Sequence, residues 1–343
     1  MKSKENYLYS YALLRIIACL AVIVHHVHSQ VYFDVSSKDF AALVNNLLMC
    51  NNGLFFMLSG KFALENYDGN IKKYYKKKAV SILLPYVAFS FFYYIRYQGF
   101  VFAGSWLRDF FVAFMSNQIV DYLWFIPTLI GFYLVAPFFA IMLRVLTEKE
   151  KNALVFILIA VIGIVNIGQI SGEKILTSGY PFIGYITYCL LGYLADNCEI
   201  KKYKKLVIGV GFLCVFVSSY EYAMQLNPAI YDFCVSRILM CLAIFYFITT
   251  YSEKIVYFCK KQIKFVSKYT FYIYLFHRLG QEITFSWANS IANFENRGLY
   301  CVIYSFLVFV WSLVAAVIFE TILSFLRKIL YNTTWKNHVH RKC

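Results

Sequence analysis

Residues 8–30 read LYSYALLRIIACLAVIVHHVHSQ, the first of the long apolar stretches that decide the fold of this chain. A helix that crosses the roughly 30 Å hydrocarbon core of a bilayer needs about 20 mostly apolar residues, and this stretch is long enough. Lys2 and Lys4 precede it, and no small-residue cleavage site follows it. We therefore expect a first transmembrane span that is retained in the mature protein.

Further apolar stretches continue along the chain, separated by clusters of polar, Pro, Gly or Asn residues. A helix satisfies its backbone hydrogen bonds internally, so each stretch is expected to cross the membrane as a helix. The sequence predicts an all-α fold, a polytopic bundle of about ten transmembrane helices that forms a single integral membrane domain over residues 1–343. Ser105–Ile119 is too short to span and is expected as an amphipathic interfacial or re-entrant helix. The expected spans are residues 8–30, 42–64, 79–101, 122–146, 153–170, 180–197, 206–226, 233–251, 268–290 and 299–325.

The composition excludes an ordinary soluble domain. Hydrophobic residues make up 61% of the 343 residues and charged residues only 15%, whereas globular chains carry about 25% charged residues. We see no Ser/Gly/Pro-rich linker and no internal repeat of the kind found in many transporters. No appended soluble domain is expected.

The 33 Lys and Arg residues are distributed unevenly between alternate loops. This asymmetry predicts that both termini face the cytoplasm. It also explains the net charge of +15 without a nucleic-acid partner, which would need a basic patch on a soluble surface. With the N-terminus inside, the outer loops hold only Lys38, Arg108, Lys174 and Arg297.

The ten cysteines indicate neither a zinc site nor a disulfide framework. They form no CxxC pair, show no recurring spacing and lie mostly within apolar stretches. We expect them to act as small apolar packing residues, and we predict no metal site.

Arg15 and His26 are functional candidates within the first span. Eleven positions separate them, which at about 100° per residue places both on one helix face, about 16 Å apart along the axis. Ionisable groups inside a span are costly unless they face a polar cavity. A second interpretation stays open for Arg15, whose depth allows the guanidinium to snorkel to the inner headgroups.

Two other histidines of the first span lie on different faces. His25 is turned about 80° from the Arg15–His26 face, and His28 points nearly opposite to it. We expect a structural, interfacial role for His28.

The sequence SKYTFYIYLFHRLGQE at residues 267–282 forms a second polar cluster. His277 and Arg278 are expected near mid-membrane, with Glu282 about one turn beyond and Tyr274 on a face similar to that of His277. This face is expected to point into the bundle.

Two further candidates have structural explanations of equal or greater weight. Ser59 and Gly60 interrupt an apolar stretch, which indicates close helix packing as readily as a substrate contact. Lys78 ends the lysine-dense segment 71–78, whose charge suits inner topology and anionic lipid. The same charge also suits the phosphates of a nucleotide-containing donor.

Taken together, these motifs resemble acyltransferase family 3, the integral-membrane acyltransferases that decorate bacterial surface glycans and lipids. Arg15 and His26 match its Arg-and-His signature, with His25 adjacent. The other matching elements, in the family's order over nearly the whole chain, are FFMLSG at 55–60, LWFIPTLIGFYLVAP at 123–137 through Trp124, Tyr133 and Pro137, YITYCLLGY at 185–193 and SKYTFYIYLFH at 267–277.

The resemblance implies transfer of an acyl group, commonly acetyl, from cytoplasmic acyl-CoA to a hydroxyl of a cell-surface polysaccharide or its lipid-linked precursor. It implies His26 as the general base, Arg15 as the residue that positions the donor or offsets negative charge, and His25 beside them. Acyl-CoA is then a substrate and no bound cofactor is expected. The bilayer, the glycan and glycan-assembly proteins are the expected partners, at the bacterial cell (cytoplasmic) membrane. The residues expected to bind donor or acceptor are Ser59, Lys78, Trp124, Tyr133, Tyr274, His277 and Arg278.

One motif departs from the family. Many members have Arg-x-x-Arg before the third span, where this chain has Lys78-Ala79-Val80-Ser81. Because Ser81 cannot replace a guanidinium, a donor-binding role for this loop is weakened.

Two other functions stay open at this point. The first is a polysaccharide or small-solute exporter in which Arg15, His26 and His277 line a pathway without covalent chemistry. The second is a structural subunit of a glycan-assembly complex, which would leave the alignment of Arg15 with His26 unexplained.

Overall fold

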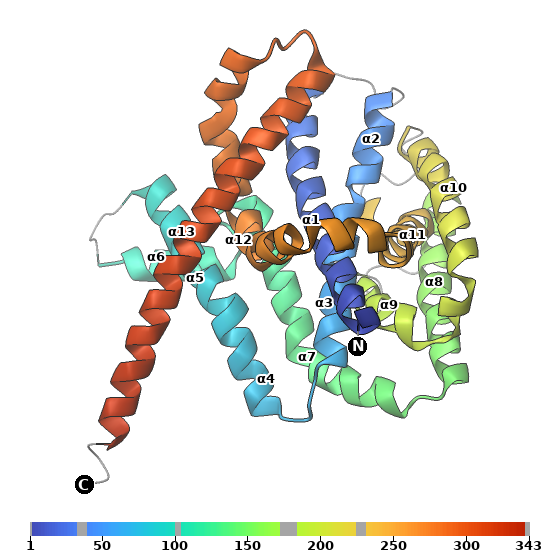
Figure 1. The fold of residues 1–343 in the computed structure, drawn as a ribbon, viewed down its shortest axis with the longest axis horizontal. Coiled ribbons are helices and arrows are strands. Elements are labelled where there is room, and N and C mark those ends of the chain that lie inside the picture. Colours follow the sequence, from blue (N-terminus) through green and yellow to red (C-terminus); the bar gives the residue numbers. More distant parts are fainter. Residues whose placement is uncertain (1, 33–39, 100–103, 172–183, 224–230, 340–343) are drawn as a thin grey trace. The chain divides into compact units, whose positions relative to one another are not determined.

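The computed structural model describes residues 2–32, 40–99, 104–171, 184–223 and 231–339, and every regular element in those ranges is a helix (Figure 1). The all-α prediction is confirmed. In the described residues, seven helical segments are long and apolar enough to cross a membrane, or up to eight if one bent pair is a single span, so the chain is a multi-pass membrane protein. The seven are Leu8–Val31, Leu43–Glu65, Ile71–Gln98, Asp121–Val145, Glu148–Gly168, Glu199–Glu221 and Arg297–Phe325.

Three of the expected spans are not among these seven. The span expected at 180–197 begins outside the described residues, and its described part, α9 (Tyr185–Asn197), has 13 residues. The spans expected at 233–251 and 268–290 belong to α11 (Val235–Tyr251) and α12 (Glu253–Ile291), which form the bent pair. The number of crossings and the side of the termini therefore stay predictions.

The chain forms two compact units. Unit 1 combines residues 1–49 with residues 248–343, and unit 2 comprises residues 50–247. Neighbouring helices in sequence thus belong to different units at two points of the chain.

Unit 1 is built from α1 (Lys2–Val31), α2 (Phe40–Leu48), α12 and α13 (Arg297–Val339). α12 and α13 pack along each other, and both pack against α1 (Figure 1). Gly280 allows α12 to approach α13, because a Cβ at this position would lie 2.7 Å from Ser312 Oγ and 3.1 Å from the Trp311 ring. This close packing fixes which face of α12 meets α1.

The loop expected between residues 251 and 268 is instead helical, because α12 begins at Glu253. Only Cys259 departs from helical geometry there, with φ −108° and ψ 19°. Val256 and Ile263 are buried, which gives this helix a packing face that its lysine content hides in a hydropathy profile. The exposed side chains include Lys254, Lys261, Lys264 and Lys268, and the large apolar residues Ile255, Tyr257, Phe258 and Phe265.

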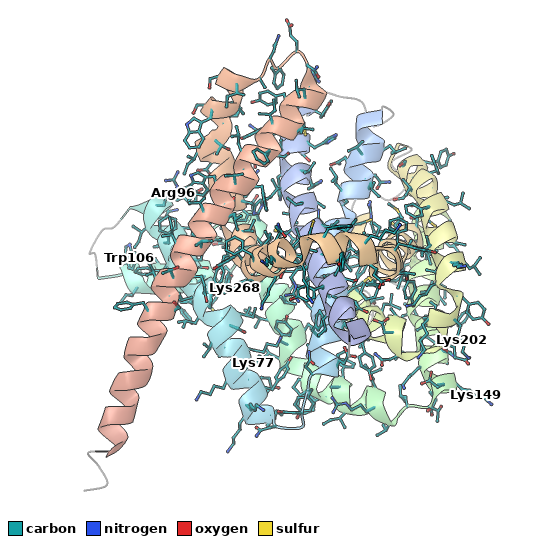
Figure 2. All side chains as sticks on the ribbon, in the orientation of Figure 1. Lys77, Arg96, Trp106, Lys149, Lys202 and Lys268 are labelled. Carbon is teal, nitrogen blue, oxygen red and sulfur yellow. The ribbon has the colours of Figure 1, made fainter. Side chains whose placement is uncertain are left out.

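Unit 2 contains the remaining helices of the chain. Lys77, Lys149 and Lys202 lie toward one end of this unit and Arg96 and Trp106 lie toward the other (Figure 2). The sequence-based topology expects these three lysines on one side of the membrane, and that side stays a prediction. The elements of unit 2 are α3 (Cys50–Glu65), α4 (Ile71–Lys78), a π-helical turn (Ala79–Leu83), α5 (Leu84–Gln98), α6 (Trp106–Met115), α7 (Phe125–Val145), α8 (Glu148–Ser171), α9, α10 (Lys204–Ala223) and α11, with 3₁₀ turns at Asp121–Trp124, Glu199–Tyr203 and Tyr231–Phe233.

α3 and α9 cross at two glycines. A Cβ on Gly60 would overlap the backbone carbonyl of Cys189, and a Cβ on Gly192 would overlap that of Met57. One turn after this crossing, the buried Lys61 ammonium lies 2.9 Å from an Asp196 carboxylate oxygen. The ion pair joins the same two helices, so close packing and charge attraction both hold α3 against α9.

α6 is the short amphipathic helix expected between residues 105 and 119. Leu107, Phe111 and Met115 form an exposed stripe at every fourth position. On another face, Trp106 and Phe110 pack against Phe91 of α5, with ring centroids 5.5 Å and 5.4 Å apart. The interfacial placement of α6 stays a prediction.

Candidate active site

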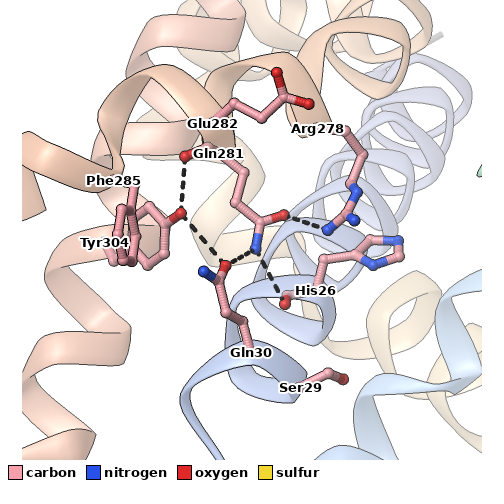
Figure 3. Close-up of a pocket in the computed structure, with 8 residues that line it drawn as sticks. All are labelled: His26, Ser29, Gln30, Arg278, Gln281, Glu282, Phe285 and Tyr304. Atoms are coloured by element: carbon pink, nitrogen blue, oxygen red, sulfur yellow. Dashed lines mark hydrogen bonds between the residues drawn. The ribbon is translucent and has the colours of Figure 1, made fainter. Parts of the chain in front are cut away.

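A pocket of about 610 Å³ lies within unit 1, where α1, α12 and α13 meet (Figure 3). Residues three and four positions apart share a helix face, so the lining residues of α1 and of α12 each form a single stripe. The lining residues are His26, Ser29 and Gln30 from α1, Arg278, Gln281, Glu282 and Phe285 from α12, and Tyr304 from α13.

His26 is one of three imidazole rings that lie close together. Its ring centroid is 5.1 Å from that of His277 and 5.4 Å from that of His25. His277 is 1% exposed, and its Nδ1 lies 2.5 Å from the Tyr274 carbonyl oxygen. Because a carbonyl only accepts, Nδ1 carries the proton of neutral His277. Of the three imidazoles, His26 is the one that lines the pocket and can reach a bound molecule.

Arg278 and Glu282 are the charged side chains of the pocket lining. The Arg278 guanidinium lies beside the His26 ring, and the two side chains come from different helices (Figure 3). This arrangement places a proton acceptor next to a fixed positive charge. Such a pair can deprotonate a hydroxyl and stabilise the negative charge that develops when the oxygen attacks a carbonyl.

The glutamines of the pocket were not recognised from the sequence. Gln281 Nε2 donates to Gln30 Oε1 at 2.6 Å, and Tyr304 donates from its hydroxyl to the Gln281 carbonyl at 2.8 Å. In the sequence each is an uncharged amide near the end of a span. Such a residue indicates a functional site less strongly than a charged residue within a span does. Ser29 and Phe285 carried no signal of their own.

The structure brings only part of the predicted site into the pocket. His26 and Arg278 line it, and the rings of His277 and His25 are in contact with the His26 ring. The Tyr274 ring lies 5.5 Å from that of His277 and does not line the pocket.

Arg15 and His28 also lie outside the pocket lining. Arg15 is half-buried on α1, three turns before His26. His28 is buried and stacks on Tyr32 with ring centroids 4.6 Å apart, as suits a structural residue.

Two residues of unit 2 that are predicted to bind donor or acceptor are in contact with each other. The Lys78 ammonium lies 3.5 Å from the centroid of the Tyr133 ring, close enough for a cation–π interaction. Lys78 immediately precedes the π-helical turn Ala79–Leu83, and such turns often occur at functional sites.

Trp124 and Ser59, the other predicted residues of unit 2, lie in packed surroundings. The Trp124 ring centroid is 5.2 Å from that of Tyr185, whose hydroxyl donates to Asp232. Phe56 stacks on Tyr185 at 4.2 Å, so three of the sequence motifs meet at one aromatic cluster. Ser59 is half-buried beside the Gly60 crossing.

Among the described residues, no three His, Cys, Asp or Glu side chains are grouped so that they could hold a metal ion.

Comparison with known protein families identifies the family of the chain. A model of the acyltransferase 3 family, described as an acyltransferase domain, matches residues 8–324. No curated protein and no solved structure matches the chain. The matched range includes every residue that lines the pocket.

Proposed function

This chain belongs to the acyltransferase 3 family and is a multi-pass membrane acyltransferase; from that premise we propose that it is an O-acyltransferase acting on a glycan. The donor is cytoplasmic acyl-CoA, with acetyl as the simplest acyl group. The acceptor is a hydroxyl of a cell-surface polysaccharide or of its lipid-linked precursor, in a bacterial cell membrane.

The observation that carries this proposal is the pairing of His26 with Arg278 in one pocket. Neutral His26 removes the proton from the acceptor hydroxyl as its oxygen attacks the thioester carbonyl carbon. Arg278 offsets the negative charge on the carbonyl oxygen in the tetrahedral intermediate. The carbon–sulfur bond then breaks, the new ester leaves, and the proton on His26 passes to the departing CoA thiolate.

Lys78 and Tyr133 are proposed as part of the donor site. Their contact provides a positive charge over an aromatic face at the lysine-rich end of α4. An ammonium binds a phosphate as a point charge, which suits the phosphates of CoA. Arg15 remains a candidate for guiding the donor along α1 toward His26.

The proposal is tested with purified protein in nanodiscs, radiolabelled acetyl-CoA and an extract that contains glycan acceptors. We expect free CoA to appear together with labelled glycan, and His26→Ala to lower the rate by about 10²- to 10⁴-fold because it removes a general base. His28→Ala is the matched control and should retain activity, since His28 stacks on Tyr32 outside the pocket lining. If folded wild-type protein transferred neither acetyl nor succinyl groups, an exporter would become the better hypothesis.

A further inference from the structure

We infer that Gln281 is a positioning residue of the active site, which holds the Arg278 guanidinium in register with His26. This inference rests on the proposed function, in which Arg278 and His26 act on the same reacting group. Gln281 is 4% exposed, although it is one of the residues that line the pocket. Its side chain is therefore almost entirely committed to contacts within the protein.

The Gln281 amide makes a hydrogen bond from each of its polar atoms. Oε1 accepts from Arg278 Nη1 at 2.6 Å. Nε2 donates to Gln30 Oε1 at 2.6 Å and to the His26 carbonyl oxygen at 3.3 Å. One side chain thus connects the guanidinium to the turn of α1 that carries His26 (Figure 3).

Hydrogen-bond chemistry fixes the orientation of this amide. If the amide were flipped, its N–H groups would face the N–H donors of Arg278. Its oxygen would then face the His26 carbonyl, which can only accept. Both contacts would be lost, so only the observed orientation satisfies Arg278 and α1 together.

α13 contacts the backbone of Gln281 and the side chain of Gln30. The Tyr304 hydroxyl donates to the backbone carbonyl of Gln281 at 2.8 Å and lies 3.5 Å from Gln30 Oε1. Gln281 is therefore held to α1 through its side chain and to α13 through its backbone carbonyl. An arginine has many rotamers, and a fixed acceptor selects one of them before the substrate binds.

The competing explanation is that Gln281 merely joins three helices. Thr284 provides a matched control, because it is also buried on α12 and its hydroxyl donates to the Gly280 carbonyl at 2.8 Å, but it does not line the pocket. Gln281→Leu and Thr284→Val each remove a buried polar group from the same helix. A purely structural role predicts similar losses of activity that follow the loss of thermal stability.

The positioning role predicts a specific kinetic pattern. Gln281→Leu should lower kcat by about 10- to 100-fold with little change in KM for acyl-CoA, because a misplaced catalytic group costs rate rather than binding. Thr284→Val should keep kcat. Gln281→Glu keeps the acceptor for Arg278 but loses both hydrogen bonds donated to α1, so its kcat should lie between those of the wild type and Gln281→Leu. In the background of Arg278→Met, adding Gln281→Leu should cost no further rate, because the residue through which Gln281 acts is already gone.

A second readout needs no turnover. Phenylglyoxal modifies accessible guanidinium groups, and peptide mass spectrometry reports the modification of Arg278 in full-length protein in nanodiscs. We expect Arg278 to react several-fold faster in Gln281→Leu than in the wild type or in Thr284→Val. Equal labelling rates, or independent multiplicative losses of kcat in the Arg278→Met/Gln281→Leu double variant, would overturn the inference. If the wild type showed no acyl transfer but the labelling difference held, the proposed function would fail while the positioning contact stood.

Discussion

Arg278 and Arg15 compete for one chemical role, the stabilisation of negative charge during acyl transfer. Only Arg278 lines the pocket beside His26, and its Nη1 is held at 2.6 Å by Gln281. Arg15 lies about 16 Å along the α1 axis from His26. A guanidinium that must meet the carbonyl oxygen near His26 is therefore better supplied by Arg278.

We expect Arg278→Lys to lower kcat by about 10²-fold, because an ammonium does not reproduce a planar donor held in place. Arg15→Lys should have a much smaller effect on kcat and act mainly on KM for the donor. Steady-state kinetics of both variants in nanodiscs measure the difference. A wild-type kcat in Arg278→Lys combined with an inactive Arg15→Lys would assign the role to Arg15 instead.

The sequence was informative about residues wherever helix geometry alone relates them. The spacing of Arg15 and His26 placed them on one face of α1 without knowledge of any other helix. Gln281 could not be found in this way, because its partner Gln30 lies 251 positions away. The importance of an amide in a span depends on what it meets, and no local pattern records that.

At the scale of helices, the α3–α9 crossing leaves no space for a larger side chain at its glycines. Gly60→Ala places a Cβ against the carbonyl of Cys189, which is backbone and cannot rotate away. We expect a loss of about 1–3 kcal/mol in stability from overpacking, seen as earlier thermal unfolding in detergent. Gly131→Ala on α7 is the control, because a Cβ there meets nothing within 4 Å and alanine favours the helix. Equal unfolding temperatures for both variants would contradict the packing argument.

Hydropathy located most of the helices but missed the first part of α12. Four exposed lysines within residues 253–268 lower the mean hydropathy of that segment, so it resembled a loop. The residues that pack inward, Val256 and Ile263, are too few to show in an average. The amphipathic α6 was predictable because its apolar stripe extends along most of this short helix, whereas the first part of α12 has few buried apolar residues.

For the molecule as a whole, orientation in the membrane is the prediction that labelling can test directly. Cys259 is the one exposed cysteine among the described residues, and it lies in a lysine-rich segment expected on the cytoplasmic side. In a Cys343→Ser background, a membrane-impermeant maleimide should label Cys259 in inside-out vesicles and leave it unmodified in right-side-out ones. Asn293→Cys, with Cys259 replaced by serine, should show the reverse pattern. Labelling of both positions from the same side would contradict the predicted topology.

The division into two units was beyond the reach of the sequence. Positive charge in alternate loops indicates which side each loop faces, but it does not indicate which helices pack together. Residues 1–49 join residues 248–343 in unit 1, while the 198 residues of unit 2 lie between them in the chain. The pairing depends on contacts that form only between helices, such as the hydrogen bond from Gln281 Nε2 of α12 to Gln30 Oε1 of α1.

This division has a consequence for how the protein is made. A ribosome completes α1 first and reaches Arg278 only 252 residues after His26, which at 5–20 residues per second takes roughly 10–50 s. During that interval the His26 and Gln30 face of α1 lies in or beside the membrane without α12, and exposing such polar groups to lipid is costly. The polar face of the newly made α1 must therefore be kept from lipid until α12 is made, by the insertion machinery or by other parts of the nascent chain. A product of interrupted translation that stopped before α12 would lack the five of the eight pocket-lining residues that α12 and α13 supply.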